Sequence, residues 1–516
     1  MELKVFKDTL AAYGGRWEGR QELPVETEIL IPDYLPAVFK IVKCRVEPIL
    51  LQNRVAGARW QCEGYLRCTV YYQSDEPGCR LYRVEQKFAF EKSVELPAGS
   101  YAEGPAQTWG ELEYCNCRAV SEHRIDLRGA YILCGAVLAR RECELLTSLA
   151  DCGIEQRART LRGMQRVAAE EKTLTASAVL PMPEPGATVL EIGGHFALGE
   201  ASLQSGRASV QGVLQVQVCC QPAGEEQLTV RTKEIPVQQT VDLPGVTAED
   251  TCVAWGEIQA CTLAAPDAGE EGALSLGWKL HVEVWRETAC TVVADAYSTL
   301  YQTQTVQTAC KLLNKTADLA ERVSVVLQDE LPDPELTVTG CFVTLGKAVP
   351  MAVQDAGAAA QFCLCGKGTA HVLCADARGE VTCFDKNFTW RPEGVWQGAA
   401  PDACACVSAA VTRVSSSKNG AQLQVELEIG VSGLLLQAHT GEALCEVELG
   451  EAYERPVDAP ALYLYYAAAG ERVFDIAKRY HARAKDLAAA NRLPCDGGAA
   501  QDCIAQAACL LIPAAQ

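Results

Sequence analysis

The chain has 516 residues, with 66 acidic against 46 basic side chains and a formal net charge of −20. Such an acidic balance argues against a nucleic-acid partner, because phosphate backbones are bound by basic surfaces. The mixture of 49% hydrophobic and 22% charged residues is typical of a globular protein. No apolar run reaches the roughly 18 residues of a membrane span, and the N-terminus lacks a secretory signal. We therefore expect a cytoplasmic chain without a membrane span.

Internal similarity organises most of the chain. Leu/Pro-rich turn segments at 30–36, 180–185 and 331–334 recur about every 150 residues, which is the mark of a repeat architecture. A sharper landmark is Trp-Gly-Glu-Leu/Ile, which begins at Trp109 and Trp255 and is followed at the same offset by Cys115 and Cys261. At the equivalent place the third copy has only Cys-Ala-Cys-Val, from Cys404.

Between these landmarks apolar and polar residues alternate with period two, as in half-buried strands, and Pro/Gly turns separate the runs. The pattern predicts a mainly β chain of three tandem antiparallel β-sandwich-like repeats, followed by a small βααβ domain. The expected divisions are an N-terminal segment (1–25), β-repeat 1 (26–140), a connecting segment (141–175), β-repeat 2 (176–310), a second connecting segment (311–325), a degenerate β-repeat 3 (326–450), a linker (451–461) and the last domain (462–514).

The two connecting stretches differ from the repeats in amino-acid composition. Residues 139–176 are rich in Arg, Glu, Ala and Leu, a composition that favours a helix or an extended crossing segment. Residues 311–323 are helix-like as well.

Cysteine is unusually abundant, with 26 residues. We expect most of them to be small buried hydrophobic residues on strands. Late oxidative cross-linking in an assembled structure is one alternative, and a metal site is another. The densest group, which would supply the ligands of such a site, comprises Cys363, Cys365, His371, Cys374 and Cys383.

Motifs of known catalytic chemistry are missing from the sequence. It has no phosphate-binding Gly-x4-Gly-Lys-Ser/Thr loop, no Gly-x-Ser-x-Gly nucleophile elbow and no His-Glu-x-x-His zinc helix. The six histidines are widely scattered, and nothing singles out one pair among the many carboxylates. We expect a protein that is not an enzyme, with no catalytic residue, no cofactor and no metal site.

The last 50 or so residues carry a different pattern. Val473, Ile476, Ala477 and Tyr480 fall on one face of a helix, a second short helix is expected over 484–490, and a strand over 510–513 closes the chain. In order, these landmarks resemble a LysM domain. The resemblance implies glycan contacts from two loops, which comprise Gly470, Glu471, Arg472 and Val473 and then Asn491, Arg492 and Leu493. Because Val473 fits the inward stripe, the next residue, Phe474, is expected to face outward. It would serve there either as an aromatic anchor for a partner or as a contact for the long loop over 495–509.

The β-repeats resemble the SPOCS-type domain of clostridial spore-coat morphogenetic proteins, in which tandem copies precede a C-terminal LysM domain. The pentapeptide from Asp295 to Thr299, Asp-Ala-Tyr-Ser-Thr, is the most telling likeness. The resemblance implies a structural protein of endospore coat morphogenesis in the mother-cell cytoplasm, at the forespore surface. Its implied partner is the sporulation coat-scaffold ATPase, and its β-repeats could also serve self-assembly.

The alternative is a LysM protein that binds peptidoglycan or another N-acetylglucosamine glycan, with the β-repeats as spacers. Charge bears on this choice, because residues 471–492 contain six basic and three acidic side chains in an otherwise acidic chain. A locally basic domain could approach an acidic partner that the rest of the molecule repels.

Overall fold

The computed structural model describes residues 2–75, 80–181, 187–222, 228–264, 271–353, 360–454, 462–493 and 503–513. Antiparallel strands make up nearly all of its regular structure, so the predicted mainly β class is confirmed. Within these residues, no helix has both the length and the apolar character needed to cross a bilayer.

The first β-body is built from two sheets that share one core. One sheet has the order β2 (Lys40–Ala56), β3 (Arg59–Gln73) and β4 (Leu81–Glu95). The other pairs β7 (Arg124–Ala150) with β1 (Lys4–Leu30) on one side and with β6 (Gln107–Ser121) and the short β5 (Ser100–Tyr101) on the other. Trp60, Leu66, Ile29 and Leu127 are almost wholly buried between the two sheets. Alternation along each strand places these apolar side chains on the inner faces.

The second β-body follows the same plan. The sheet of β9 (Thr188–Gln204), β10 (Arg207–Gln221) and β11 (Thr229–Asp242) packs on the sheet of β8 (Ile154–Pro181), β13 (Glu271–Ser298) and β12 (Thr251–Ala264). Trp278 lies in its core, 1% exposed and stacked on Phe196.

The third β-body is more broken. Its long sheet contains β14 (Tyr301–Glu330), β21 (Gln422–Ala452) and β20 (Ala403–Asn419). Its second sheet is centred on β17 (Gln361–Ala375), flanked by β15 (Thr337–Leu345), β16 (Val349–Val353), β18 (Val381–Trp390) and β19 (Val395–Gln397). A single 3-10 turn, η1 (Ala400–Asp402), precedes β20.

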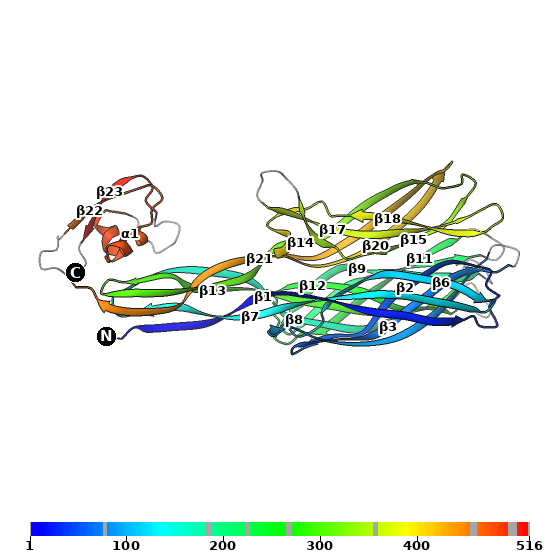
Figure 1. Cartoon of the computed structure of the whole chain (residues 1–516), viewed down its shortest axis with the longest axis horizontal. Coiled ribbons are helices and arrows are strands. Elements are labelled where there is room, and N and C mark those ends of the chain that lie inside the picture. The colour runs from blue at the N-terminus through cyan, green and yellow to red at the C-terminus, as the bar shows by residue number, and fades with distance from the viewer. Residues whose placement is uncertain are drawn as a thin grey trace.

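Each β-body extends into one long two-stranded antiparallel ribbon, formed by β1 with β7, β8 with β13 and β14 with β21. In each ribbon the pairing register shifts near the edge of the body, between Tyr13 and Gly15, between Val284 and Trp285, and between Lys315 and Ala317. Such bulges bend a strand. Beyond them the three ribbons pack together through a shared apolar cluster that includes Leu10, Leu145, Leu161, Val292 and Leu312. They form one stalk, which runs from the β-bodies toward the N-terminus in Figure 1.

Of the two alternatives for residues 139–176, the structure has the extended one, and the helix predicted over 311–323 is wrong. Residues 139–176 lie in β7 and β8 apart from a tight turn at 151–153, and residues 311–323 lie in β14. Leu145, Leu161 and Leu312 are buried between neighbouring ribbons, so pairing and packing outweigh local helix propensity here.

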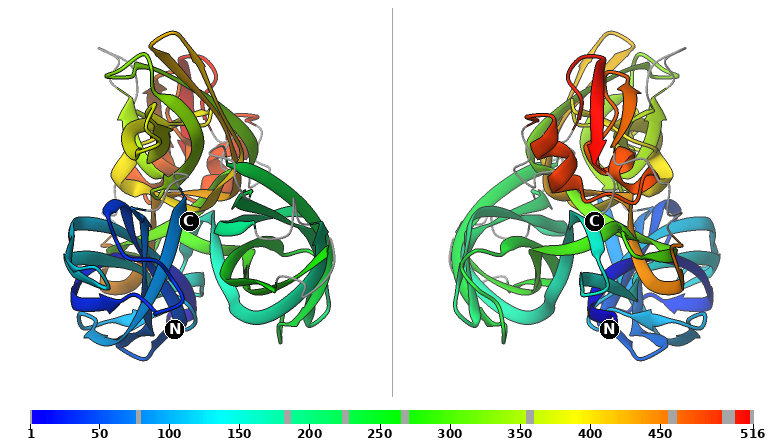
Figure 2. Two further views of the ribbon diagram at one scale, coloured as in Figure 1. Left: turned by 90° about the vertical axis from the view of Figure 1, so that its right-hand side faces the viewer. Right: turned by 90° about the vertical axis from the view of Figure 1, so that its left-hand side faces the viewer.

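The three β-bodies surround a common axis, as the end-on views in Figure 2 show. The landmark segments of the sequence meet near this axis. Trp255 packs in a cluster with Cys404 and Cys406, and Gln107 donates a hydrogen bond to the sulfur of Cys406 at 3.0 Å. The ammonium of Lys347 lies 3.7 Å from the ring centroid of Trp109. The tryptophan motif and its cysteine counterpart therefore join the bodies to one another.

A small domain sits at the free end of the stalk (Figure 1). It consists of β22 (Leu462–Ala467), α1 (Val473–Arg479), α2 (Ala484–Ala490) and β23 (Ala508–Pro513), with β22 and β23 antiparallel. Its core contains Val473, Ile476, Leu487 and Ile512. We call it the C-terminal domain.

Candidate functional site

The first predicted loop of the C-terminal domain is fixed by backbone bonds. Gly470 has a φ of 90°, a left-handed conformation that favours glycine. Its N–H donates to the carbonyl of Ile504 at 2.8 Å, and the N–H of Ile504 donates to the carbonyl of Glu471 at 2.8 Å. The Glu471 carboxylate accepts the Tyr465 hydroxyl at 2.9 Å. The loop is thus held against the segment that leads into β23.

Helix α1 starts at this loop without a side-chain cap. Arg472 occupies the N-cap position, and its exposed side chain makes no cap bond. Val473 is buried, as the sequence predicted. Because Glu471 is already engaged by Tyr465, Arg472 is the charged side chain of this loop that remains available to a partner.

In the second predicted loop, Asn491 is hydrogen-bonded within the domain, Arg492 is exposed and Leu493 is partly buried. The side-chain amide of Asn491 donates to the carbonyls of Leu487 at 2.8 Å and Leu511 at 2.7 Å, and its oxygen accepts the Leu511 N–H at 2.7 Å. Arg492 is exposed with a φ of 55°, whereas Leu493 packs partly on the core. Among the described residues no hydrogen bond or ion pair joins 470–473 to 491–493, and residues 494–502, which follow the second loop, lie outside them.

Phe474 does not face the solvent as predicted. Its side chain is only 5% exposed, because α1 lies on the end of the stalk. The ring of Tyr297 meets it edge-on at 5.1 Å, and the guanidinium of Arg157 lies 5.9 Å from its centroid. The aromatic side chain is an anchor within the molecule and is not available to a partner.

Polar contacts surround this aromatic pair. The Tyr297 hydroxyl donates to the carbonyl of Ala482 at 2.8 Å, and Lys478 pairs with Asp295 at 2.6 Å. Burial raises the pKa of the Glu155 carboxyl, although the N–H of Ala484 at the start of α2 donates to it and lowers the pKa in part. We call the stalk residues of this contact, Glu155, Arg157, Asp295 and Tyr297, the docking face of the stalk.

The pentapeptide Asp295–Thr299 is therefore a junction. Besides the contacts of Asp295 and Tyr297, the Ser298 hydroxyl donates to the carbonyl of Cys152 at 2.6 Å, and the Thr299 hydroxyl donates to that of Gly153 at 3.1 Å. The first and third ribbons end instead on the unlike segments 148–150 and 450–452. Sequence reasoning found the motif but missed this role; its presence on one ribbon alone was the available signal.

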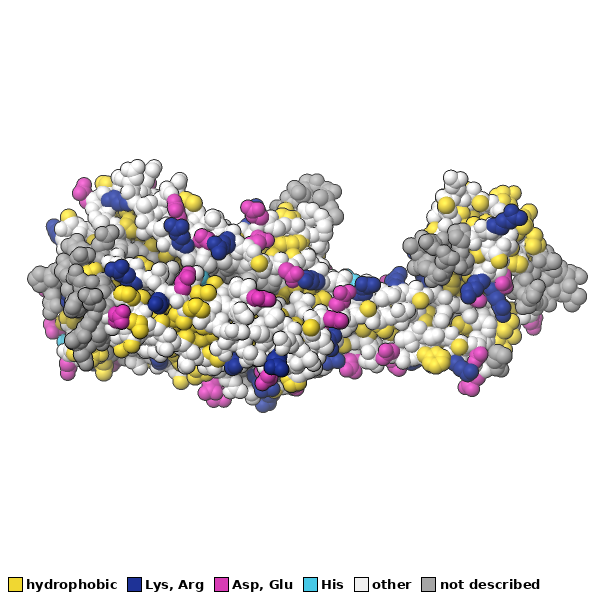
Figure 3. Space-filling model, turned by 180° about the vertical axis from the view of Figure 1, so that it is seen from behind, with side chains coloured by type: hydrophobic (Ala, Val, Ile, Leu, Met, Phe, Trp, Pro, Cys, Tyr) yellow, Lys and Arg dark blue, Asp and Glu magenta, His cyan; other side chains and the backbone are white. Residues whose placement is uncertain are grey.

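The surface of the C-terminal domain away from the stalk mixes basic and apolar side chains (Figure 3). Alternate residues of β22 present Leu462, Leu464 and Tyr466 to solvent, and Tyr466 is 80% exposed. Arg472 and Arg479 are exposed as well.

Of the cysteine-rich group considered for a metal, only part comes together. His371 and Cys383 meet at Asp385, within the third β-body. Asp385 already accepts from His371 at 2.7 Å and pairs with Lys43 at 2.5 Å, and the hydroxyl of Thr344 lies 3.1 Å from the other ring nitrogen. With these partners in place, we assign no metal to the cluster. All described cysteines are free thiols.

A family model described as the SPOCS domain of SipL matches residues 37–120. The matched span runs through the part of the first β-body that contains β2, β3, β4, β5 and β6. No curated protein and no solved structure matches the chain significantly. The match supports a sporulation-associated protein.

Proposed function

We propose that this chain is a non-enzymatic structural protein of endospore coat morphogenesis, built from three SPOCS-type β-repeats and a C-terminal LysM-type domain. The observation that carries the proposal is the SPOCS match over residues 37–120. The second and third β-bodies support the extension to three repeats, because each likewise packs two sheets on one core and extends into one long two-stranded ribbon. The order β22, α1, α2, β23 supports the LysM-type assignment.

In this proposal the molecule works in the mother-cell cytoplasm at the forespore surface and links two layers. The C-terminal domain contacts the coat-scaffold ATPase, while the β-bodies, at the far end of the stalk, contact coat proteins or further copies of the chain. The stalk supports such a division, since it separates the two regions (Figure 1).

A protein partner is favoured over a glycan by how the loop residues are used. The amide of Asn491 and the carboxylate of Glu471 are both engaged within the domain. Exposed Arg472 and Arg492 remain, and two cations suit an acidic protein surface better than a neutral sugar. Glycan binding with the β-bodies as spacers is the competing function.

The test measures binding of the full chain to the purified coat-scaffold ATPase and, in parallel, to purified peptidoglycan. We expect submicromolar binding to the ATPase that weakens at least tenfold in the Arg472→Glu, Arg492→Glu double variant. Arg231→Glu, an exposed arginine on the second β-body, is the matched control and should bind normally. Saturable retention on peptidoglycan with no ATPase binding would instead establish the glycan function.

A further inference from the structure

Three half-buried thiols meet at one edge of the first β-body. Cys44 lies on β2, whereas Cys115 and Cys117 lie on β6, which belongs to the other sheet. All three side chains pack against the core of this body. Cys115 and Cys117 are two residues apart on one strand, so they point to the same face, and exposed Asn116 between them points away. We call these three residues the thiol group.

Cys44 is the central member of the thiol group. Its sulfur lies within hydrogen-bond reach of the sulfurs of both Cys115 and Cys117. Strand β2 is an edge strand of one sheet, and β6 is an edge strand of the other. Each edge can therefore move slightly toward the other without breaking a ladder on its outer side. Either pair can thus close to the length of a disulfide bond, in which the sulfur atoms are about 2.0 Å apart.

The contact also makes one of the thiols more acidic. The hydrogen bond from Cys44 lowers the pKa of the Cys115 thiol, although burial raises it in part, and the nearby charge of Lys43 lowers it further. Hydrogen bonds with Cys115 and Cys117 raise the pKa of Cys44 itself. Because the thiolate is the nucleophile in thiol oxidation, Cys115 is the member expected to react first.

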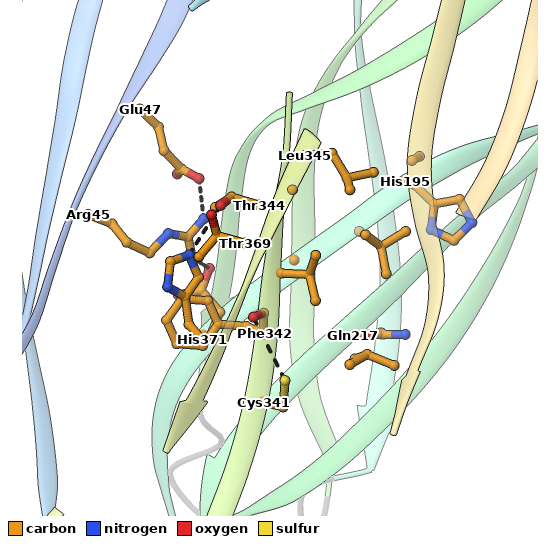
Figure 4. A pocket seen from close by; sticks show the side chains of 18 of the residues that line it. Arg45, Glu47, His195, Gln217, Cys341, Phe342, Thr344, Leu345, Thr369 and His371 are labelled. Atoms are coloured by element: carbon orange, nitrogen blue, oxygen red, sulfur yellow. Dashed lines mark hydrogen bonds and ion pairs between the residues drawn. The ribbon is translucent and has the colours of Figure 1, made fainter. Parts of the chain in front are cut away.

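A large cavity gives a small molecule a way to the edge of β2. It has a volume of about 1980 Å³, is lined by residues of all three β-bodies, and has Cys44 in its lining. Figure 4 shows the next residues of β2 on this wall, Arg45 and Glu47, close to His371 of the third body. A molecule of the size of hydrogen peroxide fits this space easily.

Two other pairs of thiols in contact are much less exposed. Cys143 contacts Cys310 within the stalk, and Cys404 contacts Cys406 near the common axis. All four side chains are at most 5% exposed. Since oxidation requires access as well as a nearby second thiol, we expect these pairs to stay reduced under conditions that oxidise the thiol group.

We propose that the thiol group is an oxidation site, at which Cys44 forms a disulfide with Cys115 inside the chain and Cys117 serves as an exchange partner. The oxidant is hydrogen peroxide. The Cys115 sulfur attacks one peroxide oxygen, the O–O bond breaks, and the Cys115 thiol becomes a sulfenic acid with release of water. The Cys44 sulfur then attacks the sulfur of Cys115, the S–O bond breaks, and the hydroxide leaves with the Cys44 proton as a second water. The two thiols lose two electrons, which the peroxide takes up.

The product ties the two sheets of the first body together. A bond from Cys44 to Cys115, or after exchange to Cys117, joins β2 to β6, which belong to different ladders. Such a bond restrains an edge that otherwise depends on side-chain packing, and it stabilises the folded chain by constraining the unfolded one. The inference does not rest on the sporulation assignment.

The experiment treats the full, fully reduced chain with a small excess of hydrogen peroxide. We expect the number of thiols titrated in denaturant to fall by two from 26. Peptide mapping by mass spectrometry should then find Cys44 linked to Cys115 or Cys117. Hydrogen exchange of the oxidised chain should be slowed at least tenfold in β2 and β6, and reduction with dithiothreitol should reverse the effect.

Matched variants localise the chemistry. Cys44→Ser removes the central thiol, so the sulfenic acid on Cys115 should persist and be trapped by dimedone, with no disulfide formed. Cys117→Ser should still lose two thiols. Cys261→Ser is the control and should behave as the wild-type chain, because Cys261 of the second body contacts no second thiol among the described residues. Cys44→Ala, which adds no hydroxyl, repeats the test if the serine variant is unstable.

Retention of all thiols by the wild-type chain overturns the proposal, as does a disulfide mapped to Cys143 and Cys310 while the thiol group stays reduced. Equal loss of two thiols in the folded Cys44→Ser and wild-type chains overturns it too. So does purification of the chain with stoichiometric zinc that Cys44→Ser loses, because the thiol group is then a metal site.

Discussion

The two sides of the C-terminal domain differ in what their side chains contact. On the stalk side, Phe474 packs against Tyr297, and Lys478 forms an ion pair with Asp295. At the loop side, Arg472 and Arg492 are exposed. Both sides belong to the same short helices, so docking one side fixes the direction of the other. The stalk therefore orients the arginines as well as separating them from the β-bodies.

The largest expected effect comes from Tyr297→Ala. It removes the aromatic contact with Phe474 and the hydrogen bond to Ala482, and we expect docking to weaken by about 3–5 kcal/mol, as for other buried aromatic residues. Hydrogen exchange should show loss of protection in α1 and at the stalk end, with the β-bodies unchanged.

Tyr297→Phe is the matched control, because it keeps the ring and loses only the hydroxyl. Its cost should be about 0.5–1.5 kcal/mol. If both variants leave α1 equally protected, the docking face does not hold the domain.

Asn491→Ala tests the domain itself and leaves docking aside. It removes three hydrogen bonds, one to Leu487 within α2 and two to Leu511 of β23, and we expect the domain to lose about 1–3 kcal/mol of unfolding free energy. Hydrogen exchange of the Leu487 and Leu511 backbone amides, followed at increasing denaturant concentration, measures this loss. A normal unfolding free energy would mean that Asn491 is free to serve a ligand, which would favour the glycan function.

The same comparison shows how far the sequence could be read. Helices α1 and α2 lie where periodicity placed them, because Val473, Ile476 and Leu487 form a local core. Phe474 was misjudged because its burial depends on Tyr297, far away in the sequence. Periodicity within one helix cannot report a neighbour from another element. The stalk was missed for the same reason, since its strands are fixed by pairing across ribbons.

Docking should also depend on pH through Glu155. Because burial raises the pKa of this carboxyl, the docked state favours its protonated form. Docking is then strongest below the ordinary carboxyl pKa and weakens as pH rises through the raised value. Exchange protection factors of α1, measured between pH 4 and 7, should fall with pH. Glu155→Gln should flatten this dependence, and an unchanged slope would assign it to another group.

The smallest effect on stability, and the sharpest test of the loop side, comes from Arg472→Glu. The side chain is exposed and makes no cap bond, so we expect the unfolding free energy to change by less than about 0.5 kcal/mol. Binding to an acidic partner should nevertheless weaken, mainly through a slower association rate and a shallower salt dependence. Surface plasmon resonance at two salt concentrations separates the association rate from the dissociation rate.

Because the stalk fixes the direction in which the loop points, Tyr297→Ala should also change the orientation in which the partner is bound, although Arg472 itself is unchanged. If Arg472→Glu binds normally while removal of the C-terminal domain abolishes binding, the contact lies on another surface, and exposed Leu464 and Tyr466 of β22 are the next residues to change.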